Sequence, residues 1–347
     1  MQRLVVCLDG TWNVRDDTTN IWRLHALVEE LDKDHVRQQK YYDQGVGTRW
    51  YDRATGGVLG AGMYKDVREA YTWIAERYRR DDELFIFGFS RGAATALSLA
   101  NLIDRCGIVG PESINTFEDA YRLYSMNGFY RNTRASQRFR ASAVDHTART
   151  TLKFLGLFDT VSSLYLNGMS GESVHVLSLP NTAHHVAHAI AIDENRSLFS
   201  SQRFQSAPLL GHLSERWFSG AHANVGGGYA FDPLAIPPLT WMMRQAAAHG
   251  LYFRTTPIVM AEELLQSPET DSFEEFAFGL LMLAPFIFKR RRLIGRSVAG
   301  SSEEWIDSSA ISRYLRYATY RQRSIALASV LERPTRIDMG DFNVKQQ

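Results

Sequence analysis

The chain has 347 residues and carries 39 lysines and arginines against 38 aspartates and glutamates, which gives a net charge of +1. A balance this even provides no global field for nucleic acid or for an anionic membrane, so we expect no nucleic-acid partner. Hydrophobic residues make up 45% of the chain and charged residues 22%, which is typical of a globular enzyme. The two cysteines, Cys7 and Cys106, lie beside apolar residues, which argues against a disulfide framework and favours a reducing compartment.

The apolar run at residues 4–8 is too short for the core of a signal peptide, and no small-residue cleavage site follows it. We expect this run to form a buried strand, in a protein that is cytoplasmic or exported without a signal peptide. The apolar segment at residues 276–288 has thirteen residues. A membrane-spanning helix needs about 20, so the sequence predicts no transmembrane segment.

Six short runs end in polar or glycine-containing turns. They predict strands at residues 3–8, 38–43, 83–87, 152–158, 185–192 and 215–218. Helical patterns fill most of the gaps, at residues 18–31, 62–79, 91–105 and 234–249. This alternation predicts an α/β fold with a mostly parallel sheet and helices on both faces. Reactive groups in such a sheet gather at the carboxyl ends of the strands.

Residues 88–92 read Gly-Phe-Ser-Arg-Gly and lie between a predicted strand and a predicted helix. A nucleophile elbow requires this context, because small residues allow the tight turn that exposes the serine hydroxyl. The helix that follows directs its N-terminal N–H groups and its positive dipole end at a developing oxyanion. The pattern predicts Ser90 as a nucleophile, against the alternative of an ordinary glycine-rich turn.

An oxyanion hole in such a site uses the backbone N–H of the residue after the nucleophile, here Arg91, and one donor from the loop after a neighbouring strand. The turn after the first strand offers Gly10 or Thr11 as that donor. The stretch Asp9-Gly10-Thr11 is also similar to part of a phosphatase motif. Cys7 stands where that motif has its nucleophilic aspartate, so we favour the oxyanion role.

Two aspartates end predicted strands between the nucleophile and the last strand, and each is a candidate for the acid that orients a catalytic histidine. Asp159 ends the fourth strand, and Asp193 ends the fifth. Asp193 is closer to the predicted base in sequence, but Arg196 is an obvious ion-pair partner for it. The residues alone leave the two candidates nearly even.

His222 follows the sixth predicted strand within a glycine-rich stretch, which favours it as the general base. The competing histidines are His175, His184, His185, His188 and His212. Of these, we expect His185 and His188 to lie within the fifth strand. An alternative use of the glycines at 226–228 is a phosphate cradle, but no Lys-Ser/Thr pair accompanies them.

Two parts of the chain depart from the alternation. Residues 111–150 are polar and arginine-rich and predict a helical insertion in a catalytic domain of residues 1–254. Residues 255–347 predict a helical C-terminal region that acts as a lid or cap.

Within that region, the apolar segment 276–288 is followed by the basic cluster 289–292. It predicts a buried helix with a basic end, or a peripheral membrane segment whose basic cluster binds anionic head groups, or a surface for a protein partner. The candidates for substrate contact are Phe278, Leu281, Phe286 and Phe288.

Six motifs occur in order along the chain: LDGTWN, YYDQGVGT, GFSRGA, FLGLFDTV, AIDENRSLF and WFSGAHANVGGGY. From about residue 2 to residue 245 they resemble the α/β-hydrolase domain of bacterial and fungal proteins, which also forms the catalytic part of one class of type VI secretion phospholipase effectors. The resemblance implies a triad of Ser90, Asp159 and His222, and leaves Asp193 as a member of a structural ion pair. The effectors carry His-Ser-Asp where this chain has His-Ala-Asn, and the change at Asn224 bears on substrate binding or on a local cation site.

These observations predict a serine hydrolase that cleaves carboxylic esters through an acyl-enzyme, with a lipid or another acyl ester as its substrate. We expect no cofactor and no metal ion. A small-ester or thioester hydrolase is one alternative, and a non-catalytic binding module that keeps the hydrolase fold is another. The sequence does not predict the oligomeric state.

Overall fold

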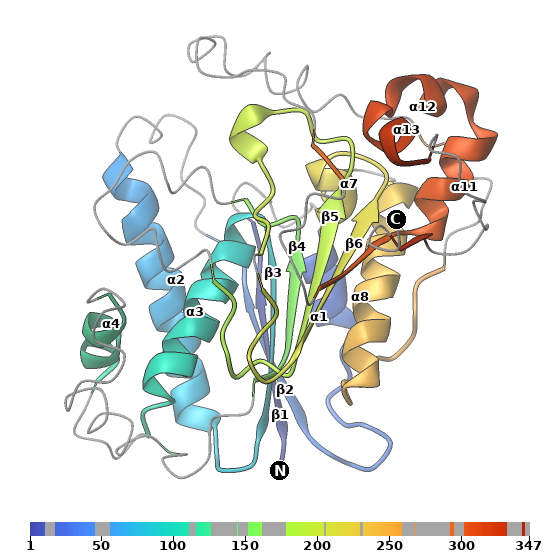
Figure 1. The fold of residues 1–347 in the computed structure, drawn as a ribbon. Coiled ribbons are helices and arrows are strands. Elements are labelled where there is room, and N and C mark those ends of the chain that lie inside the picture. The colour runs from blue at the N-terminus through green and yellow to red at the C-terminus, as the bar shows by residue number, and fades with distance from the viewer. Residues whose placement is uncertain are drawn as a thin grey trace.

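The computed structural model describes residues 1–10, 18–45, 56–110, 116–125, 144, 152–161, 178–204, 206–229, 232–258, 267, 292–294, 302–331 and 342–343. Within these residues eight strands form one sheet in the order β2-β1-β3-β4-β5-β6-β7-β8 (Figure 1). The strands β1 to β7 run parallel to one another, and β8 is antiparallel to β7. The mostly parallel sheet predicted from the sequence is confirmed.

All six predicted strands are present. They are β1 (Arg3–Leu8), β2 (Gln38–Asp43), β3 (Glu83–Phe89), β4 (Leu152–Phe158), β5 (His185–Ala191) and β6 (His212–Phe218). The largest difference is in β6, which begins at His212 rather than at residue 215. The first three residues of β6 contain one buried apolar side chain, Leu213, between the exposed His212 and the half-buried Ser214, so the pattern did not indicate a strand there. They pair in register with β5, beginning with His212 opposite His185.

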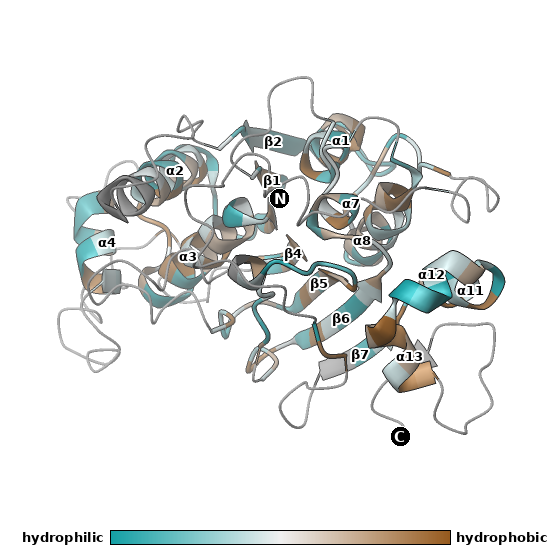
Figure 2. Ribbon diagram, turned by 90° about the horizontal axis from the view of Figure 1, so that it is seen from above, coloured by the Kyte–Doolittle hydropathy of each residue, from teal (hydrophilic) through white to brown (hydrophobic). Residues whose placement is uncertain are grey.

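Helices cover both faces of the sheet (Figure 2). The first part of the chain forms α1 (Asn20–Leu27), α2 (Gly56–Arg77), α3 (Arg91–Cys106) and α4 (Phe117–Ser125), and α7 (His222–Gly226) and α8 (Ile236–Ala248) follow β6. In β1, Leu4 and Val6 face a core shared with α2, α3 and α4. Val5 and Cys7 face the opposite core, which contains side chains of α1 and α8. This alternation is the two-residue period of a strand buried on both faces.

The region after residue 254 continues the same sheet. β7 (Ser302–Ile306) pairs with β6, and β8 (Phe342–Asn343) pairs with β7. The helices α11 (Ser308–Arg316), α12 (Ala318–Arg323) and α13 (Ile325–Leu331) pack with Ile190, Trp217 and Ile306 in a third core. The predicted helical C-terminal region is therefore present, and it includes two strands, β7 and β8, that the sequence pattern did not indicate.

Polar side chains explain why β7 was not predicted. Its Glu304 is fully buried and accepts hydrogen bonds from the Trp217 indole N–H and the Arg203 guanidinium, at 2.8 Å and 3.0 Å. A buried carboxylate satisfied by distant partners takes a place that an apolar side chain would usually fill. No helix among the described residues has both the length and the apolar character needed to cross a membrane.

Candidate active site

Ser90 lies in a sharp turn between β3 and α3. Its backbone has φ 56° and ψ −119°, a conformation with positive φ that is uncommon for a residue other than glycine. The Ser90 N–H donates to the Phe158 carbonyl at the end of β4, 3.0 Å away, and the Ser90 carbonyl accepts from Ala93 and Ala94 at the start of α3. The predicted elbow is therefore formed by backbone contacts on both of its sides.

The two glycines of the elbow are required by close packing. A Cβ on Gly88 would lie 2.4 Å from the Gly92 carbonyl oxygen, within the turn itself. A Cβ on Gly92 would lie 2.2 Å from the Leu8 carbonyl oxygen and 2.5 Å from that of Asp9. Gly92 thus lets the start of α3 approach the end of β1, and this approach brings the turn after β1 close to the elbow.

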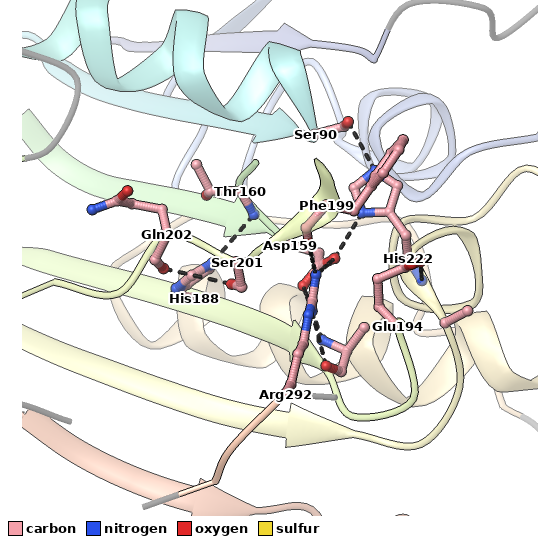
Figure 3. A network of polar contacts seen from close by, with 12 residues as sticks. Ser90, Asp159, Thr160, His188, Glu194, Phe199, Ser201, Gln202, His222 and Arg292 are labelled. Atoms are coloured by element: carbon pink, nitrogen blue, oxygen red, sulfur yellow. Dashed lines mark hydrogen bonds and ion pairs between the residues drawn. The ribbon is translucent and has the colours of Figure 1, made fainter. Parts of the chain in front are cut away.

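Three side chains predicted from the sequence form one hydrogen-bonded chain (Figure 3). The His222 Nε2 atom lies 2.8 Å from Ser90 Oγ, and His222 Nδ1 lies 2.7 Å from Asp159 Oδ2. Ser90 is 8% exposed, His222 is 5% exposed, and Asp159 is fully buried. The structure brings the three residues together, in a place that is largely covered from solvent.

The charge on Asp159 determines which nitrogen of His222 carries the proton. Burial raises the pKa of the Asp159 carboxyl, but the Arg292 charge and the His222 hydrogen bond outweigh burial and hold that pKa well below its ordinary value. An ionised carboxylate only accepts hydrogen bonds, so His222 donates to it from Nδ1. The Nε2 atom of neutral His222 is then the acceptor for the Ser90 hydroxyl, which is the arrangement that a general base needs.

Arg292 contacts the site although no sequence motif indicated it. Its two terminal nitrogens donate to both oxygens of Asp159, and they also donate to the Ala191 carbonyl at 2.8 Å and the Phe199 carbonyl at 2.6 Å. From the sequence, the cluster 289–292 was predicted as a whole to lie at a helix end, on lipid head groups or at a surface for a protein partner. The partner of a single arginine in such a run follows from tertiary structure alone.

Asp193, the runner-up acid, lies apart from His222. Its carboxylate accepts hydrogen bonds from the Gly220 N–H at 2.7 Å, the Tyr320 hydroxyl at 2.9 Å and the Ser324 hydroxyl at 3.1 Å. Burial raises its pKa. The expected ion pair between Asp193 and Arg196 is wrong, because Arg196 instead forms a two-pronged contact with Glu194, with both distances at 2.8 Å.

Glu194 is a second buried carboxylate beside His222. It is 1% exposed and accepts a hydrogen bond of 3.3 Å from the His222 backbone N–H as well as the contacts from Arg196. Burial raises its pKa, but the hydrogen bond and charge of Arg196 outweigh burial and lower it overall. Glu194 therefore fixes the backbone of His222, while Asp159 contacts its ring.

The first oxyanion donor predicted from the sequence, the Arg91 N–H, belongs to the first residue of α3, directly after Ser90. The Gly10 N–H donates to the Asp9 carboxylate at 2.7 Å in this conformation. The other predicted donor, Thr11, lies outside the described residues. The second donor of the oxyanion hole stays a prediction.

The competing histidines that the structure describes, His184, His185, His188 and His212, make no hydrogen bond with Ser90. His185 and His212 begin β5 and β6, and His184 directly precedes β5, so these three lie at the amino ends of the strands. Ser90 and His222 follow the carboxyl ends of β3 and β6. His188 lies within β5, as predicted, and His175 lies outside the described residues.

His188 holds the backbone next to Asp159. Its Nε2 atom accepts from the Thr160 N–H at 3.3 Å, and its Nδ1 atom contacts Glu215 at 3.3 Å on β6. Asp159 itself has φ 40°, and its N–H donates to the Ala189 carbonyl at 2.8 Å. Neighbouring groups thus hold the uncommon backbone conformation at Asp159 from both sides. From the sequence, His188 was predicted only to lie within the fifth strand.

Asn224 has a structural position. Its side-chain oxygen accepts from the Ala221 N–H at 2.8 Å, and its amide donates to Asp232 at 3.0 Å. Burial raises the pKa of Asp232 to about 6, although its hydrogen bonds act in the opposite direction. An aspartate at position 224 would face this carboxylate, so the amide suits its surroundings better than a second acid.

No group of three His, Cys, Asp or Glu side chains among the described residues is arranged to hold a metal ion. The proposed substrate contacts Phe278, Leu281, Phe286 and Phe288 lie outside the described residues, so their role stays a prediction.

The sheet, the elbow at Ser90 and the hydrogen-bonded chain at the strand ends are those of an α/β-hydrolase-like protein. The chain belongs to the family described as T6SS, Phospholipase effector Tle1-like, catalytic domain, which matches residues 2–245. The family resemblance recognised from the six motifs is thereby confirmed.

Three individual relatives have low sequence identity to this chain, between 17% and 24%. An uncharacterized protein of Saccharomyces cerevisiae is 24% identical over 240 residues, which are 61% of this chain and 34% of the relative. The structure of the Tle1 effector bound to the VgrG spike from the type 6 secretion system is 20% identical, with a TM-score of 0.40, over 67% of this chain and 52% of that one. An uncharacterized Pseudomonas aeruginosa protein of known structure is 17% identical, with a TM-score of 0.45, over 80% of this chain and 50% of that one. The chain spans 34% to 52% of the length of these relatives.

Replacing Gly92 by alanine should lower both stability and activity. The new Cβ would meet the Leu8 carbonyl oxygen at 2.2 Å, so α3 must move away from β1 and displace Ser90. We expect a loss of about 3 kcal/mol in the free energy of unfolding, measured in urea, and a fall in ester hydrolysis per folded molecule. Gly211→Ala is the matched control, because its Cβ would meet the Ala183 carbonyl oxygen at 2.1 Å at the opposite end of the sheet. Equal activity losses in both variants would contradict the assignment of Gly92 to the elbow.

Asp232 should make stability depend on pH. Its pKa of about 6 in the folded protein lies above the ordinary 3.8, so the folded state keeps a proton that the unfolded chain releases. Stability therefore falls as the pH rises through this window. Relative to Asp232→Asn, the wild-type free energy of unfolding should drop by about 2 kcal/mol between pH 4 and pH 7. Urea unfolding of both proteins across that range measures this difference, and parallel curves would contradict it.

Proposed function

We propose that this protein is a serine hydrolase that cleaves carboxylic esters through an acyl-enzyme, with lipids as its substrate class. The observation that carries the proposal is the continuous hydrogen-bonded chain from Ser90 through His222 to Asp159, with both links shorter than 3 Å. A serine, a histidine and an ionised aspartate in this order are the groups that nucleophilic acyl transfer requires.

In the proposed reaction, Ser90 Oγ attacks the ester carbonyl carbon while its proton passes to His222 Nε2. The tetrahedral intermediate collapses, the carbon–oxygen bond to the alcohol breaks, and His222 gives its proton to the departing alcohol oxygen. Water then attacks the acyl-enzyme with His222 again as the base, and Ser90 is released. Asp159 remains ionised throughout and stabilises the imidazolium that forms twice in each cycle.

We propose that the N-terminal end of α3 stabilises the negative charge that develops on the tetrahedral oxygen. The Arg91 N–H belongs to the first helical residue, and the positive end of the helix dipole acts in the same direction. The turn after β1 is the proposed source of the second donor, from Gly10 or Thr11. A donation by Gly10 would require its N–H to leave the Asp9 carboxylate.

The lipid substrate is supported by the family, whose description names a phospholipase effector catalytic domain. The apolar segment 276–288 gives independent support, because it ends four residues before Arg292, and Arg292 contacts Asp159. We propose that this segment, with the basic residues 289–291 that follow it, makes peripheral contact with a lipid surface.

Ser90→Ala should abolish covalent labelling by a fluorophosphonate probe, because the probe reacts with a serine that a neighbouring base activates. Hydrolysis of a p-nitrophenyl ester should fall by about 10⁶-fold in the same variant. Ser98→Ala is the matched control, since Ser98 is a buried serine of α3 that contacts Tyr124. A folded wild-type protein that takes up no label would instead support a non-catalytic binding module.

Asp159→Asn and Asp193→Asn should separate the two candidate acids. Only Asp159 accepts from His222 Nδ1, so its amide variant should lose about 10⁴-fold in kcat. Asp193→Asn disturbs Gly220 and α12 and should lose stability with a much smaller change in kcat per folded molecule. Steady-state kinetics of the two variants measure kcat, and circular dichroism gives the amount of folded protein by which kcat is normalised. A larger kcat loss in the Asp193 variant would overturn the assignment.

A substrate series should distinguish lipid from small-ester hydrolysis. We expect kcat/KM to rise with acyl chain length in p-nitrophenyl esters, and we expect turnover of phosphatidylglycerol and phosphatidylcholine vesicles. Release of fatty acid from the vesicles is the measurement, and Ser90→Ala provides the background rate. Good turnover of short esters with none from vesicles would support the small-ester or thioester alternative.

A further inference from the structure

Arg292 lies beyond residues 2–245, which the family covers, yet its guanidinium group contacts the centre of the site (Figure 3). The side chain is 7% exposed. Its planar fork faces the Asp159 carboxylate, with one terminal nitrogen on each oxygen. A paired contact of this kind fixes the plane of the carboxylate as well as its position, which a single-point contact does not.

The Asp159 carboxylate has all of its principal acceptor positions in use. Besides the two contacts from Arg292, Oδ1 accepts from the Ala191 N–H at 3.0 Å and Oδ2 accepts from His222 Nδ1 at 2.7 Å. A carboxylate offers about four lone-pair sites, so each donor here restricts the position of the others. Removing Arg292 would leave half of these contacts and would free the carboxylate to rotate away from His222.

Arg292 also fixes a second neighbour of His222. It donates to the Phe199 carbonyl at 2.6 Å, and the Phe199 ring lies edge-on to the His222 imidazole with centroids 5.1 Å apart. The Phe89 ring also packs against the same imidazole, with ring centroids 4.7 Å apart. The orientation of His222 thus depends on Arg292 by two routes, one through Asp159 and one through the backbone of Phe199.

We propose that Arg292 is a positioning residue of the triad, and that the region after residue 254 completes the site through it. Arg292 holds Asp159 in the plane that accepts from His222 and partly offsets its negative charge. The inference rests on the proposed function for its kinetic consequences, whereas its structural consequence, the ordered hydrogen bond between His222 and Asp159, does not depend on catalysis.

The charge of Arg292 should affect the pH dependence of catalysis. Among the residues that the structure describes, the charged groups in contact with His222 are Asp159, paired with Arg292, and Glu194 after the end of β5, paired with Arg196. Each of these two carboxylates is paired with an arginine, so the two ion pairs nearly balance in charge when His222 is neutral. Removing Arg292 leaves an excess negative charge that favours protonated His222, and a protonated histidine cannot accept the Ser90 proton.

The experiment compares wild type, Arg292→Gln and Arg292→Lys as full-length proteins, with kcat/KM for a short p-nitrophenyl ester measured from pH 5 to pH 9. We expect Arg292→Gln to lose about 100-fold, with the acid limb of its profile moved upward by about one pH unit. Arg292→Lys keeps the charge without the fork, so it should lose activity with its acid limb in the wild-type position.

Arg216→Gln is the matched control for docking of the C-terminal region. Arg216 of β6 pairs with Asp307, the N-cap residue of α11, at 3.3 Å, and it contacts none of Ser90, His222 and Asp159 in the structure. Its variant should keep the wild-type pH profile and should keep kcat/KM within about threefold. An Arg292→Gln protein that is folded and matches the Arg216 control in rate and pH profile would overturn the proposal.

A second measurement separates this inference from the proposed function. The His222 Nδ1 proton should give a downfield resonance in proton NMR spectra of the wild type that is missing in Asp159→Asn. We expect it to be lost or broadened in Arg292→Gln and retained in Arg216→Gln, whether or not the wild type hydrolyses esters. An unchanged resonance in Arg292→Gln would refute the positioning role. If that variant does not fold, the same test is applied to Arg292→Lys. An unchanged resonance together with a wild-type kcat/KM in Arg292→Lys would then refute the positioning role. An inactive wild type that passes the NMR test would refute only the hydrolase proposal.

Discussion

The fully buried negative charge of Asp159 is the constraint on which the rest of the site depends. Removing a carboxylate from water costs several kcal/mol, and the cost is recovered only where donors and an opposite charge surround the ion. Here the donors come from parts of the chain that are far apart in sequence: the Ala191 N–H at the end of β5, His222 at the start of α7, and Arg292. The charge therefore ties together the strand ends that form the site.

A parallel sheet makes this convergence achievable. The central strands β3, β4, β5 and β6 are neighbours in that order, so the turns that follow them lie side by side at one edge of the sheet. Ser90, Asp159, Asp193 and His222 come from these four turns in succession. The sequence pattern was sufficient to place them at one edge of the sheet, because each of them closely follows a predicted strand and the strands run in the same direction.

Other parts of the site were beyond sequence reasoning, for physical reasons that differ from residue to residue. Asp159 and Asp193 have similar local patterns, so the residues alone left them nearly even, and Asp159 was favoured only by the family resemblance. In the structure their distant partners separate them: His222 and Arg292 for the first, Tyr320 and Ser324 for the second. Charge pairing between segments has no local signature. β7 was not predicted for the same reason, because its buried Glu304 is stabilised by Trp217 and Arg203 from other parts of the chain.

The buried charges also bear on where the structural unit ends. Residues 2–245 include Asp159 and His222, but the cation that balances Asp159 comes from residue 292. Breaking a buried ion pair by removing one partner typically costs about 3–5 kcal/mol, which is a large part of the stability of an ordinary domain. Asp193 adds a second link, since Tyr320 and Ser324 hold the carboxylate that fixes Gly220, two residues before His222. A boundary near residue 254 therefore divides the sequence but not the site, because the buried carboxylates before it are balanced and held by side chains that come after it.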